Sequence, residues 1–211
     1  MSRALDVLVA AAALVVFSPV LALAALAIKL ETGGDAFFRQ RRVGRYGEPF
    51  ELWKLRTMVT GAEGMGAGIY VTPGDSRITR VGALLRRFSL DELPNLFNVI
   101  TGDLSVVGPR PTVQEQVDGY TPRQRRRLEV RPGITGWAQV NGRTSLPWPA
   151  RIELDVWYVD HRSLGLDLRI LARTVRLLMS GQGLYSEDPR QGWGTTEEPA
   201  PGARDPGARA P

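Results

Sequence analysis

The apolar and polar positions divide this chain into an apolar N-terminal segment and a longer region of mixed pattern. Val7–Ile28 contains no charged residue and one hydroxyl, that of Ser18. At a rise of 1.5 Å per residue, a straight helix over this segment would be roughly 33 Å long. That length is enough to cross the hydrocarbon core of a bilayer, so the pattern predicts a membrane helix.

Three arrangements of this helix compete. A cleaved signal peptide is disfavoured, because Arg3 is balanced by Asp6 and no convincing small-x-small cleavage site follows. A plain spanning helix is the simplest alternative. The third is a re-entrant hairpin, because Ser18-Pro19 lies in the middle of the run and an internal proline kinks a helix. Four arginines follow the segment and predict that its C-terminal side is cytoplasmic: Arg39, Arg41, Arg42 and Arg45. The pattern alone leaves the spanning helix and the hairpin open.

Beyond residue 35 the apolar period changes repeatedly between that of a strand and that of a helix. The predicted strands are Ala36–Val43, Pro49–Val59, Leu104–Val107 and a segment around Trp137. The predicted helices are Arg77–Phe88, Leu93–Ile100, Thr112–Val130, Ala150–Val159 and a last helix, capped by Ser163, that ends at Ser180. The last helix separates apolar residues from arginines, which fits a membrane interface or packing on the core. Gly61–Gly74 predicts a glycine-rich loop, and residues 197–211 predict a disordered tail.

Composition restricts the kinds of site that the chain can build. With 43% hydrophobic and 23% charged residues, the chain is typical of a folded protein. It has no cysteine and a single histidine, His161, which excludes disulfides, thiolate-bound metals and multi-histidine sites. A bound metal would therefore need oxygen ligands, which favours Mg²⁺, Mn²⁺ or Ca²⁺. The net charge of +5, mostly from arginine, suits nucleic acid, anionic lipid or phosphorylated substrates.

The adjacent acids Asp91 and Glu92 are the main candidates for chemistry. They precede Pro94, and proline is tolerated only in the first turn of a helix, so the pair should stand at a helix start. One interpretation is structural, with Asp91 as the helix cap and Glu92 favourable to the helix dipole. The other is catalytic, with the aspartate attacking phosphorus and its neighbour holding a metal.

A carboxylate that approaches a diphosphate needs cations around it. Arg86 and Arg87 precede the acid pair, and Arg110 lies between Pro109 and Pro111. Two prolines stiffen the backbone, and a rigid loop that presents a guanidinium suits phosphate binding. A solvated arginine in an ordinary proline-rich turn is the alternative.

At these residues the sequence closely resembles the bacterial sugar transferase family, the small monotopic phosphoglycosyl transferases that begin glycan assembly on undecaprenyl phosphate. The motifs are collinear from about residue 3 to residue 196, and a joint chance match is very improbable. They are Phe38–Gly44 (FRQRRVG), Lys54–Met58 (KLRTM), Asp75–Thr79 (DSRIT), Ser89–Asn98 (SLDELPNLFN), Gly102–Pro111 (GDLSVVGPRP) and Arg131–Arg143 (RPGITGWAQVNGR).

The resemblance implies a helix-rich α+β fold in the bacterial inner (cytoplasmic) membrane. A re-entrant membrane helix would occupy residues 1–30, with Ser18-Pro19 as its break. One catalytic domain, 31–196, would lie on the cytoplasmic face, with short β-strands and interfacial amphipathic helices. The bilayer would be a partner, nucleic acid would not, and a homo-oligomer is left open.

The resemblance also implies a ping-pong reaction. Asp91 would attack the β-phosphate of a UDP-sugar, release UMP and pass the sugar phosphate to undecaprenyl phosphate. Glu92 would help Asp91 to hold Mg²⁺, or Mn²⁺, and Arg110 would bind substrate phosphate. Lys54, Arg86 and Arg143 would line the site, and His161 would be structural. Such a reaction is the first membrane step of exopolysaccharide, capsule, O-antigen or glycoprotein glycan assembly. The sequence does not identify the sugar.

A non-catalytic, membrane-anchored protein that binds polyanions is the rival class. The basic charge and the apolar N-terminal helix support it, and its acid pair would be no more than a helix cap. A nucleic-acid binder of this kind would show a steep dependence of binding on salt. The transferase instead requires UMP release from a UDP-sugar, so the two classes make different predictions.

Overall fold

The computed structural model describes residues 1–65, 71, 74–142 and 146–180, apart from the side chains of residues 179 and 180. Its helices are α1 (Arg3–Thr32), α2 (Arg80–Arg87), α3 (Asn95–Thr101), α4 (Gln114–Asp118), α5 (Pro122–Arg125), α6 (Trp137–Val140), α7 (Trp148–His161) and α8 (Leu164–Ser180). Its strands are β1 (Phe37–Val43), β2 (Pro49–Leu55), β3 (Ser105–Val107) and β4 (Gly133–Thr135). Short 3-10 turns are η1 (Arg45–Gly47), η2 (Ala62–Gly64), η3 (Leu90–Glu92) and η4 (Arg126–Glu129). The fold is therefore helix-rich α+β, as the sequence predicts.

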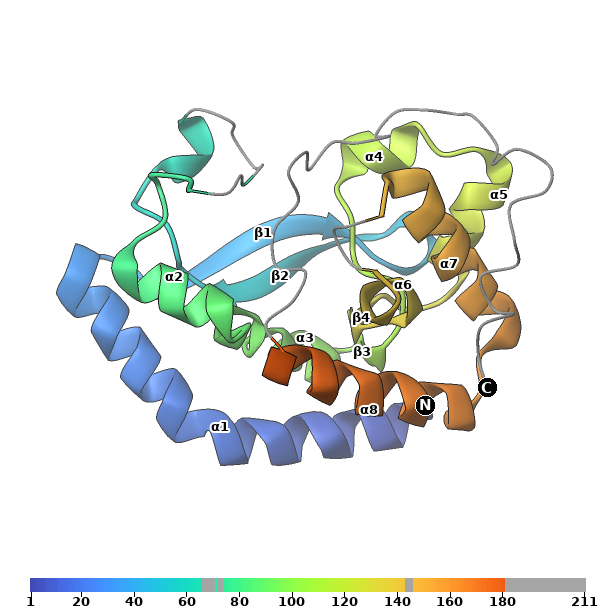
Figure 1. Ribbon diagram of the computed structural model, residues 1–211, viewed down its shortest axis with the longest axis horizontal. Coiled ribbons are helices and arrows are strands. Elements are labelled where there is room, and N and C mark those ends of the chain that lie inside the picture. The colour runs from blue at the N-terminus through green and yellow to red at the C-terminus, as the bar shows by residue number, and fades with distance from the viewer. Residues whose placement is uncertain (66–70, 72–73, 143–145, 181–211) are drawn as a thin grey trace.

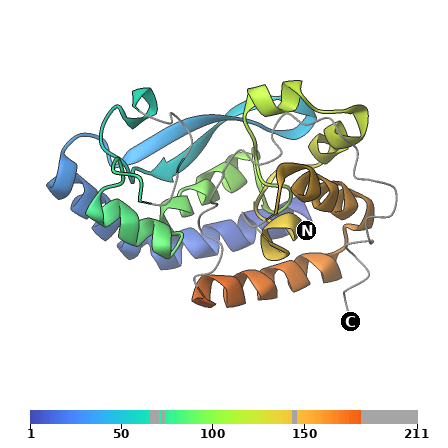
Figure 2. The ribbon, with the colours of Figure 1, turned by 45° about the horizontal axis from the view of Figure 1, so that its top comes forward.

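The strands form two small sheets. β1 and β2 make an antiparallel hairpin in which Phe38 faces Lys54 across the strands. β3 and β4 pair in parallel inside the domain. Figure 2 shows the hairpin along the upper side, with α1 and α8 along the lower side. The core between these layers includes Leu104 and Trp137, and the Trp137 ring stacks on Trp157 with 5.0 Å between the ring centroids.

The N-terminal apolar segment forms the continuous 30-residue helix α1. Figure 1 shows that α1 bends near its middle as it passes under the domain. Pro19 is the proline inside this helix, and the Ser18 hydroxyl donates to the Val15 carbonyl at 2.8 Å. A proline lacks the backbone N–H and pushes against the preceding turn, which accounts for a bend rather than a break in the helix. α1 is the one described helix long and apolar enough to cross a membrane.

Both ends of α1 are bonded to the folded domain. In the first turn, Arg3 donates to the backbone carbonyls of Val99 and Ile100, which belong to α3. Asp6 is buried and accepts hydrogen bonds from the Ser105 hydroxyl and the Val106 N–H of β3, at 2.8 and 3.2 Å.

In the last turn of α1, the Glu31 carboxylate accepts the Arg80 and Val81 N–H groups that begin α2, at 2.8 and 3.0 Å. The Arg56 guanidinium donates to the Thr32 hydroxyl at 2.8 Å. These polar contacts attach the two ends of α1 to one body, although its middle is largely apolar and exposed.

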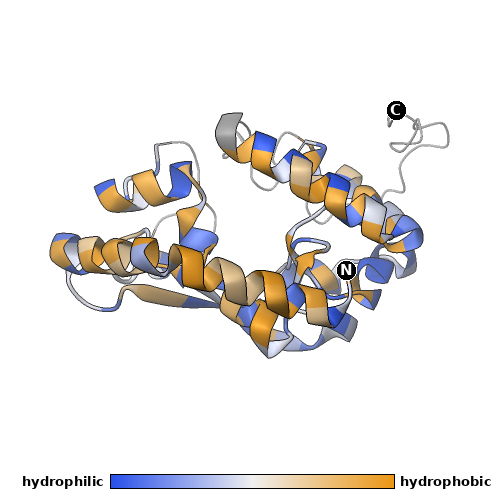
Figure 3. Ribbon diagram, turned by 90° about the horizontal axis from the view of Figure 1, so that it is seen from below, coloured by the Kyte–Doolittle hydropathy of each residue, from blue (hydrophilic) through white to orange (hydrophobic). Residues whose placement is uncertain are grey.

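The face around α1 carries many exposed apolar side chains. They are Leu8, Val15, Val16, Phe17, Leu23, Leu26 and Leu30 on α1, Leu84 on α2, Phe97 and Ile100 on α3, and Leu164, Leu168, Val175 and Leu178 on α8. Figure 3 shows α1, α2 and α8 from this side, with hydrophobic residues along all three. α8 also has a buried apolar line, Leu166 and Ile170, that packs in the core. Packing on the core and lying at a membrane interface are thus compatible for α8, because one line of its surface faces the core and another faces the solvent.

Two sequence predictions are wrong in detail. Thr112–Val130 is not one helix but three short pieces, α4, α5 and η4, and α5 begins at Pro122 after a Thr121 capping box. Proline cannot continue a helix from the preceding residues, so a new turn must start there. The segment around Trp137 is helical rather than extended, and strand pairing is confined to Gly133–Thr135.

Other boundaries differ by a few residues. The strand predicted to reach Val59 ends at Leu55, and the helix predicted from Arg77 begins at Arg80. Thr79 sets that start, because its hydroxyl accepts the Gly82 N–H at 2.9 Å. The Ser163 cap is confirmed by a 3.2 Å bond from the Leu166 N–H. The predicted tail, 197–211, and part of the glycine-rich loop lie outside the described residues.

Candidate active site

A cavity of about 700 Å³ opens between the β1–β2 hairpin, the turn η3, the loop after β3 and the start of α7. Its charged lining is mostly cationic. The basic residues are Arg42, Lys54, Arg56, Arg86, Arg110, Arg127 and Arg151, and the acidic residues are Asp35, Glu63, Asp91, Glu92 and Asp155. The structure therefore brings together the predicted Asp91, Glu92, Lys54, Arg86 and Arg110. The predicted Arg143 lies outside the described residues.

A strained turn places the acid pair at the cavity. Ser89, two residues after the end of α2, has a left-handed conformation with φ of 54°, which costs a non-glycine residue on the order of 1–3 kcal/mol. The chain then makes the 3-10 turn η3, and α3 starts only at Asn95. The structural interpretation of Asp91 as the cap of this helix is wrong, because the α-helix begins four residues later and Pro94 precedes it.

A buried amide fixes the turn η3 relative to the hairpin. The Asn98 side chain, 2% exposed, accepts the Trp53 N–H at 3.0 Å and donates to the Glu51 carbonyl at 2.8 Å. These bonds join α3 to β2. Lys54 of β2 consequently lies beside Glu92, which precedes α3.

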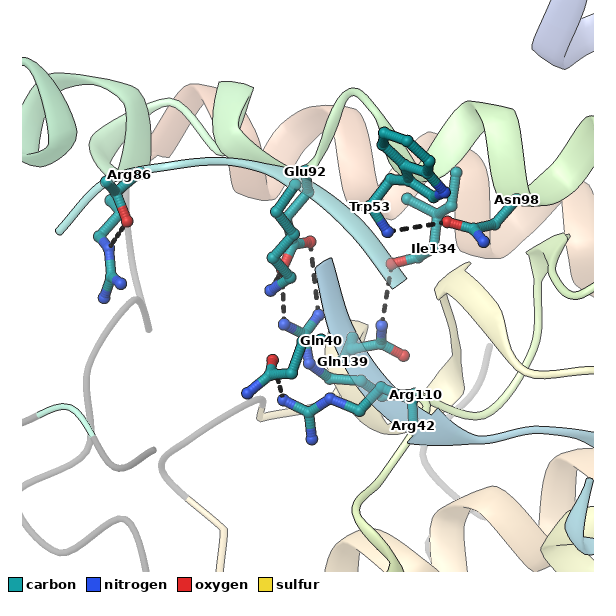
Figure 4. Close-up of polar contacts among 11 residues, drawn as sticks. Gln40, Arg42, Trp53, Arg86, Glu92, Asn98, Arg110, Ile134 and Gln139 are labelled. Carbon is teal, nitrogen blue, oxygen red and sulfur yellow. Dashed lines mark hydrogen bonds and ion pairs between the residues drawn. The ribbon is translucent and has the colours of Figure 1, made fainter. Parts of the chain in front are cut away.

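Glu92 is the anionic centre of the site. Arg110 Nη2 lies 2.5 Å from Glu92 Oε1 and Arg110 Nη1 lies 3.4 Å from Oε2, and Lys54 Nζ lies 3.4 Å from Oε1. Figure 4 shows Glu92 pointing to the Arg110 guanidinium, with Arg42 and Gln40 next to it. Burial opposes ionisation of Glu92, but the charges of Arg110 and Lys54 outweigh it and hold its pKa well below the usual range. The alternative of a merely solvated Arg110 is therefore wrong.

Asp91 has the opposite environment. Within the described ranges, no hydrogen bond or ion pair engages its carboxylate. Burial and the neighbouring Glu92 charge raise the pKa of Asp91, while Lys54, Arg86 and Arg110 act against that shift. Two adjacent carboxyls thus differ: Glu92 is neutralised by cations, and Asp91 is left available at the cavity. Such a split is typical of sites where two carboxyls have different roles.

The cations around the pair are only partly engaged. Arg86 on α2 donates through Nε to the Thr57 hydroxyl at 2.8 Å, and no other bond of its guanidinium is made within the part of the chain described. Burial lowers the pKa of Lys54, and Glu92 counteracts the shift. An Arg86 guanidinium fixed at one nitrogen and open at the other two is suited to phosphate oxygens.

Arg42 is a site residue that the sequence predictions missed. Its Nη2 donates to Gln40 Oε1 at 2.6 Å, and its Nε is buried without a partner. Burial and the Arg110 charge lower its pKa to about 10. Period-two alternation could have identified it, because Phe38, Gln40 and Arg42 share one strand face and Phe38 pairs with Lys54.

The acid pair fits the chemistry of a magnesium ligand set. No group of three or more histidine, cysteine or acidic residues that could hold a metal occurs among the residues described. Mg²⁺, however, is commonly bound by one or two carboxylates together with substrate phosphates. Asp91 is unengaged, and the Glu92 oxygens can accept contacts beyond those with Arg110 and Lys54. Asp91 and Glu92 could therefore hold Mg²⁺ or Mn²⁺ when a diphosphate is bound.

Asp91 has no ion pair in the described structure, Glu92 is paired with cations, and further basic residues line the same cavity. This arrangement is typical of the class of enzymes that act on phosphorylated substrates. The sequence comparisons agree with this class. Residues 1–181 match the family model described as bacterial sugar transferase. The chain belongs to the bacterial sugar transferase family, and this membership favours an enzyme over the polyanion binder.

Several curated relatives are similar over most of this chain. An uncharacterized sugar transferase, EpsL, of Bacillus subtilis is 48% identical over 74% of this chain and 76% of its own length. The UDP-glucose:undecaprenyl-phosphate glucose-1-phosphate transferase of Caulobacter vibrioides is 46% identical over 87% of this chain and 71% of its own length. The exopolysaccharide production protein ExoY of Rhizobium meliloti is 38% identical over 87% of both chains.

Proposed function

We propose that this protein transfers a sugar 1-phosphate from a UDP-sugar to undecaprenyl phosphate, with release of UMP, in the first membrane step of exopolysaccharide or related glycan assembly. Relatives whose names state this reaction with glucose or N-acetylgalactosamine are 46% and 41% identical to the chain. The observation that carries the proposal is the pairing of an unengaged Asp91 with a cation-lined cavity.

In the first step, an Asp91 carboxylate oxygen attacks the β-phosphorus of the UDP-sugar. The bond between that phosphorus and the bridging oxygen breaks, and UMP leaves with the electron pair. Asp91 suits this role because it is not neutralised by a direct ion pair, whereas Glu92 is. Lys54, Arg86 and Arg110 offset the repulsion between the carboxylate and the diphosphate.

In the second step, a phosphate oxygen of undecaprenyl phosphate attacks the same phosphorus atom. The bond to Asp91 breaks, which regenerates the carboxylate and leaves the lipid diphosphate sugar. Mg²⁺, or Mn²⁺, held by Asp91 and Glu92 would neutralise phosphate charge. Arg110 in its proline-flanked loop and Arg86 would orient the phosphates.

We further propose that α1 enters and leaves the membrane on one side. The contacts at its two ends support this topology, because Arg3 and Asp6 bind α3 and β3 while Glu31 binds α2 of the same domain. A straight spanning helix would place these ends on opposite sides of the bilayer. The bend around the proline directs the apolar middle of the helix away from the domain, and the catalytic domain would face the cytoplasm.

The test is UMP release from a panel of UDP-sugars by detergent-solubilised protein with undecaprenyl phosphate and Mg²⁺. Asp91→Asn should lower the rate by on the order of 10³-fold or more, because it removes a covalent nucleophile. Replacing Mg²⁺ with excess chelator should also abolish release.

Asp35→Asn is a matched control, because Asp35 is another acid at the cavity wall and lacks a role in the proposed steps. Equal rates for wild type and Asp91→Asn would refute the assignment of the nucleophile. The absence of UMP release from every UDP-sugar in the panel would refute the proposed function.

A further inference from the structure

The loop after β3 carries Arg110 between Pro109 and Pro111. These two prolines have no N–H groups, so they cannot donate backbone hydrogen bonds that would hold the loop. Main-chain bonds hold the loop on either side of Arg110. They run from Gly108 N–H to Thr135 O, from Gly133 N–H to Pro109 O and from Val43 N–H to Thr112 O, each at 2.8 Å. The carbonyl of Arg110 itself is bound by a side chain, through Arg127 Nη2 at 2.9 Å.

Arg127 is held in a buried network. Its side chain is 2% exposed, and the same Nη2 lies 2.5 Å from Oδ2 of Asp155 on α7. Nη1 donates to the Tyr120 hydroxyl, in the segment between α4 and α5. Because a guanidinium is a rigid planar fork, fixing it at Asp155 and Tyr120 also fixes the position of the Arg110 carbonyl.

Burying the charges of Arg127 and Asp155 costs desolvation free energy, so this ion pair adds little net stability to the fold. A well-packed hydrophobic pair in place of a buried ion pair is often neutral or stabilising. Arg127 and Asp155 both line the cavity. Net stability therefore does not account for this buried pair. Its contact with the Arg110 carbonyl suggests a role in positioning the loop.

We propose that Arg127, oriented by Asp155, is a positioning residue that holds the Arg110 carbonyl and so directs the Arg110 guanidinium to Glu92 and to substrate phosphate. The inference rests on the proposed function. Arg127 acts through Arg110, so its contribution to the rate requires the Arg110 side chain.

Arg123 provides a matched control. It also pairs with an acid of α7, through Arg123 Nη2 and Glu153 Oε2 at 2.8 Å, but it is 53% exposed. Its hydrogen bonds within the described residues go to Glu153 rather than to the loop around Arg110. Arg123→Met should leave the rate of UMP release within about twofold of wild type, because exposed ion pairs contribute little.

The experiment is a double-mutant cycle on UMP release. Arg127→Met should lower kcat/KM on the order of 10-fold in the otherwise wild-type protein, since small misplacements of a binding group are costly. In an Arg110→Ala background, measured at high enzyme concentration, the same substitution should have an effect of less than about twofold. An equal loss in both backgrounds, as general damage to the fold would give, overturns the inference, and so does the absence of loss in the wild-type background.

Folding is controlled with Arg127→Met/Asp155→Leu, which replaces the buried ion pair with a hydrophobic pair. It should melt close to wild type and still lose activity; a return to wild-type activity would overturn the inference. If Arg127→Met does not fold, Arg127→Lys takes its place in the cycle and is judged by the same two outcomes. The proposed function fails separately, when wild type itself releases no UMP.

Discussion

At the scale of single residues, the site depends on two neighbouring carboxyls with different surroundings. Arg110 and Lys54 form ion pairs with Glu92, whereas they act on Asp91 only through electrostatic attraction at longer range. Burial consequently dominates for Asp91 and raises its pKa, while the paired cations lower the pKa of Glu92. Burial therefore disfavours the charged form of Asp91, and its place at the cavity costs stability, as is common for reactive groups.

The raised pKa of Asp91 leads to a stability prediction. Above its raised pKa, ionised Asp91 costs folding free energy. Below the ordinary aspartate pKa of about 3.9, the folded and unfolded states are both protonated and the cost disappears. We therefore expect Asp91→Asn to raise the melting temperature at pH 7, by an amount that shrinks towards pH 4. Thermal unfolding between pH 4 and pH 8 measures this difference.

Glu92→Gln is the contrasting variant. The folded pKa of Glu92 is depressed, so its charge stabilises the fold above the ordinary glutamate pKa, and this contribution is lost as pH falls through the depressed value. Glu92→Gln should thus lower the melting temperature at pH 7.

For the Asp91 prediction, a lower melting temperature of Asp91→Asn than of wild type at pH 7 would contradict the argument that burial disfavours the charged carboxyl.

At the scale of elements, the position of α2 depends on one close backbone contact. A Cβ at Gly82 would lie 2.0 Å from the Thr57 carbonyl oxygen, so only glycine permits this approach. The same helix places Arg86 Nε 2.8 Å from the Thr57 hydroxyl. The close contact that docks α2 therefore also places the Arg86 guanidinium at the cavity.

Gly82→Ala should destabilise the protein by about 1–3 kcal/mol, as overpacking usually does, and lower UMP release because Arg86 moves with α2. Chemical denaturation and the UMP assay measure the two effects. Gly165→Ala in α8 is the control, since a Cβ there meets nothing within 4 Å. That substitution should stabilise the helix by up to about 1 kcal/mol. Similar stabilities for the two variants would show that α2 does not require the close contact.

At the scale of the whole molecule, α1, α2 and α8 lie along one side of the domain and carry exposed apolar residues there. The cavity wall includes Gly34, in the segment after α1, and Phe37, the first residue of β1. A membrane along the apolar face would thus bring a lipid phosphate close to the cavity. Because both ends of α1 are attached to the domain, this arrangement needs no crossing of the bilayer.

Cysteine labelling tests this topology, and the natural chain contains no cysteine to interfere. Ser2→Cys, before α1, and Glu115→Cys, on the domain surface, should both react with a membrane-impermeant maleimide only after the cytoplasmic side is exposed. Labelling of Ser2→Cys from outside in intact cells, with Glu115→Cys protected, would identify a spanning helix instead.

The sequence predicted the existence of most elements but not all of their boundaries. A continuous apolar run predicts α1, two strand-like segments around a turn predict the hairpin, and the Ser163 cap with a helical apolar line predicts α8. The residue spacing of Thr112–Val130 predicts one helix, but Pro122 begins a separate helix, α5, within it. The glycines around Trp137 favour a strand, yet the residue lies in the helical turn α6, where it packs against Trp157 and the core.

The sequence by itself determined the class of this protein, because an apolar helix, an acid pair and long collinear motifs are local features of the chain. Only the tertiary structure showed that Asp91 does not cap α3, that Arg110 and Lys54 neutralise Glu92, and that Arg42 and Arg127 line the same cavity. The physical reason is that charge pairing and burial depend on groups distant along the chain. Arg110 is 18 residues from Glu92 along the chain, and Asp155 is 28 residues from Arg127. A local sequence pattern cannot show that such distant residues form ion pairs.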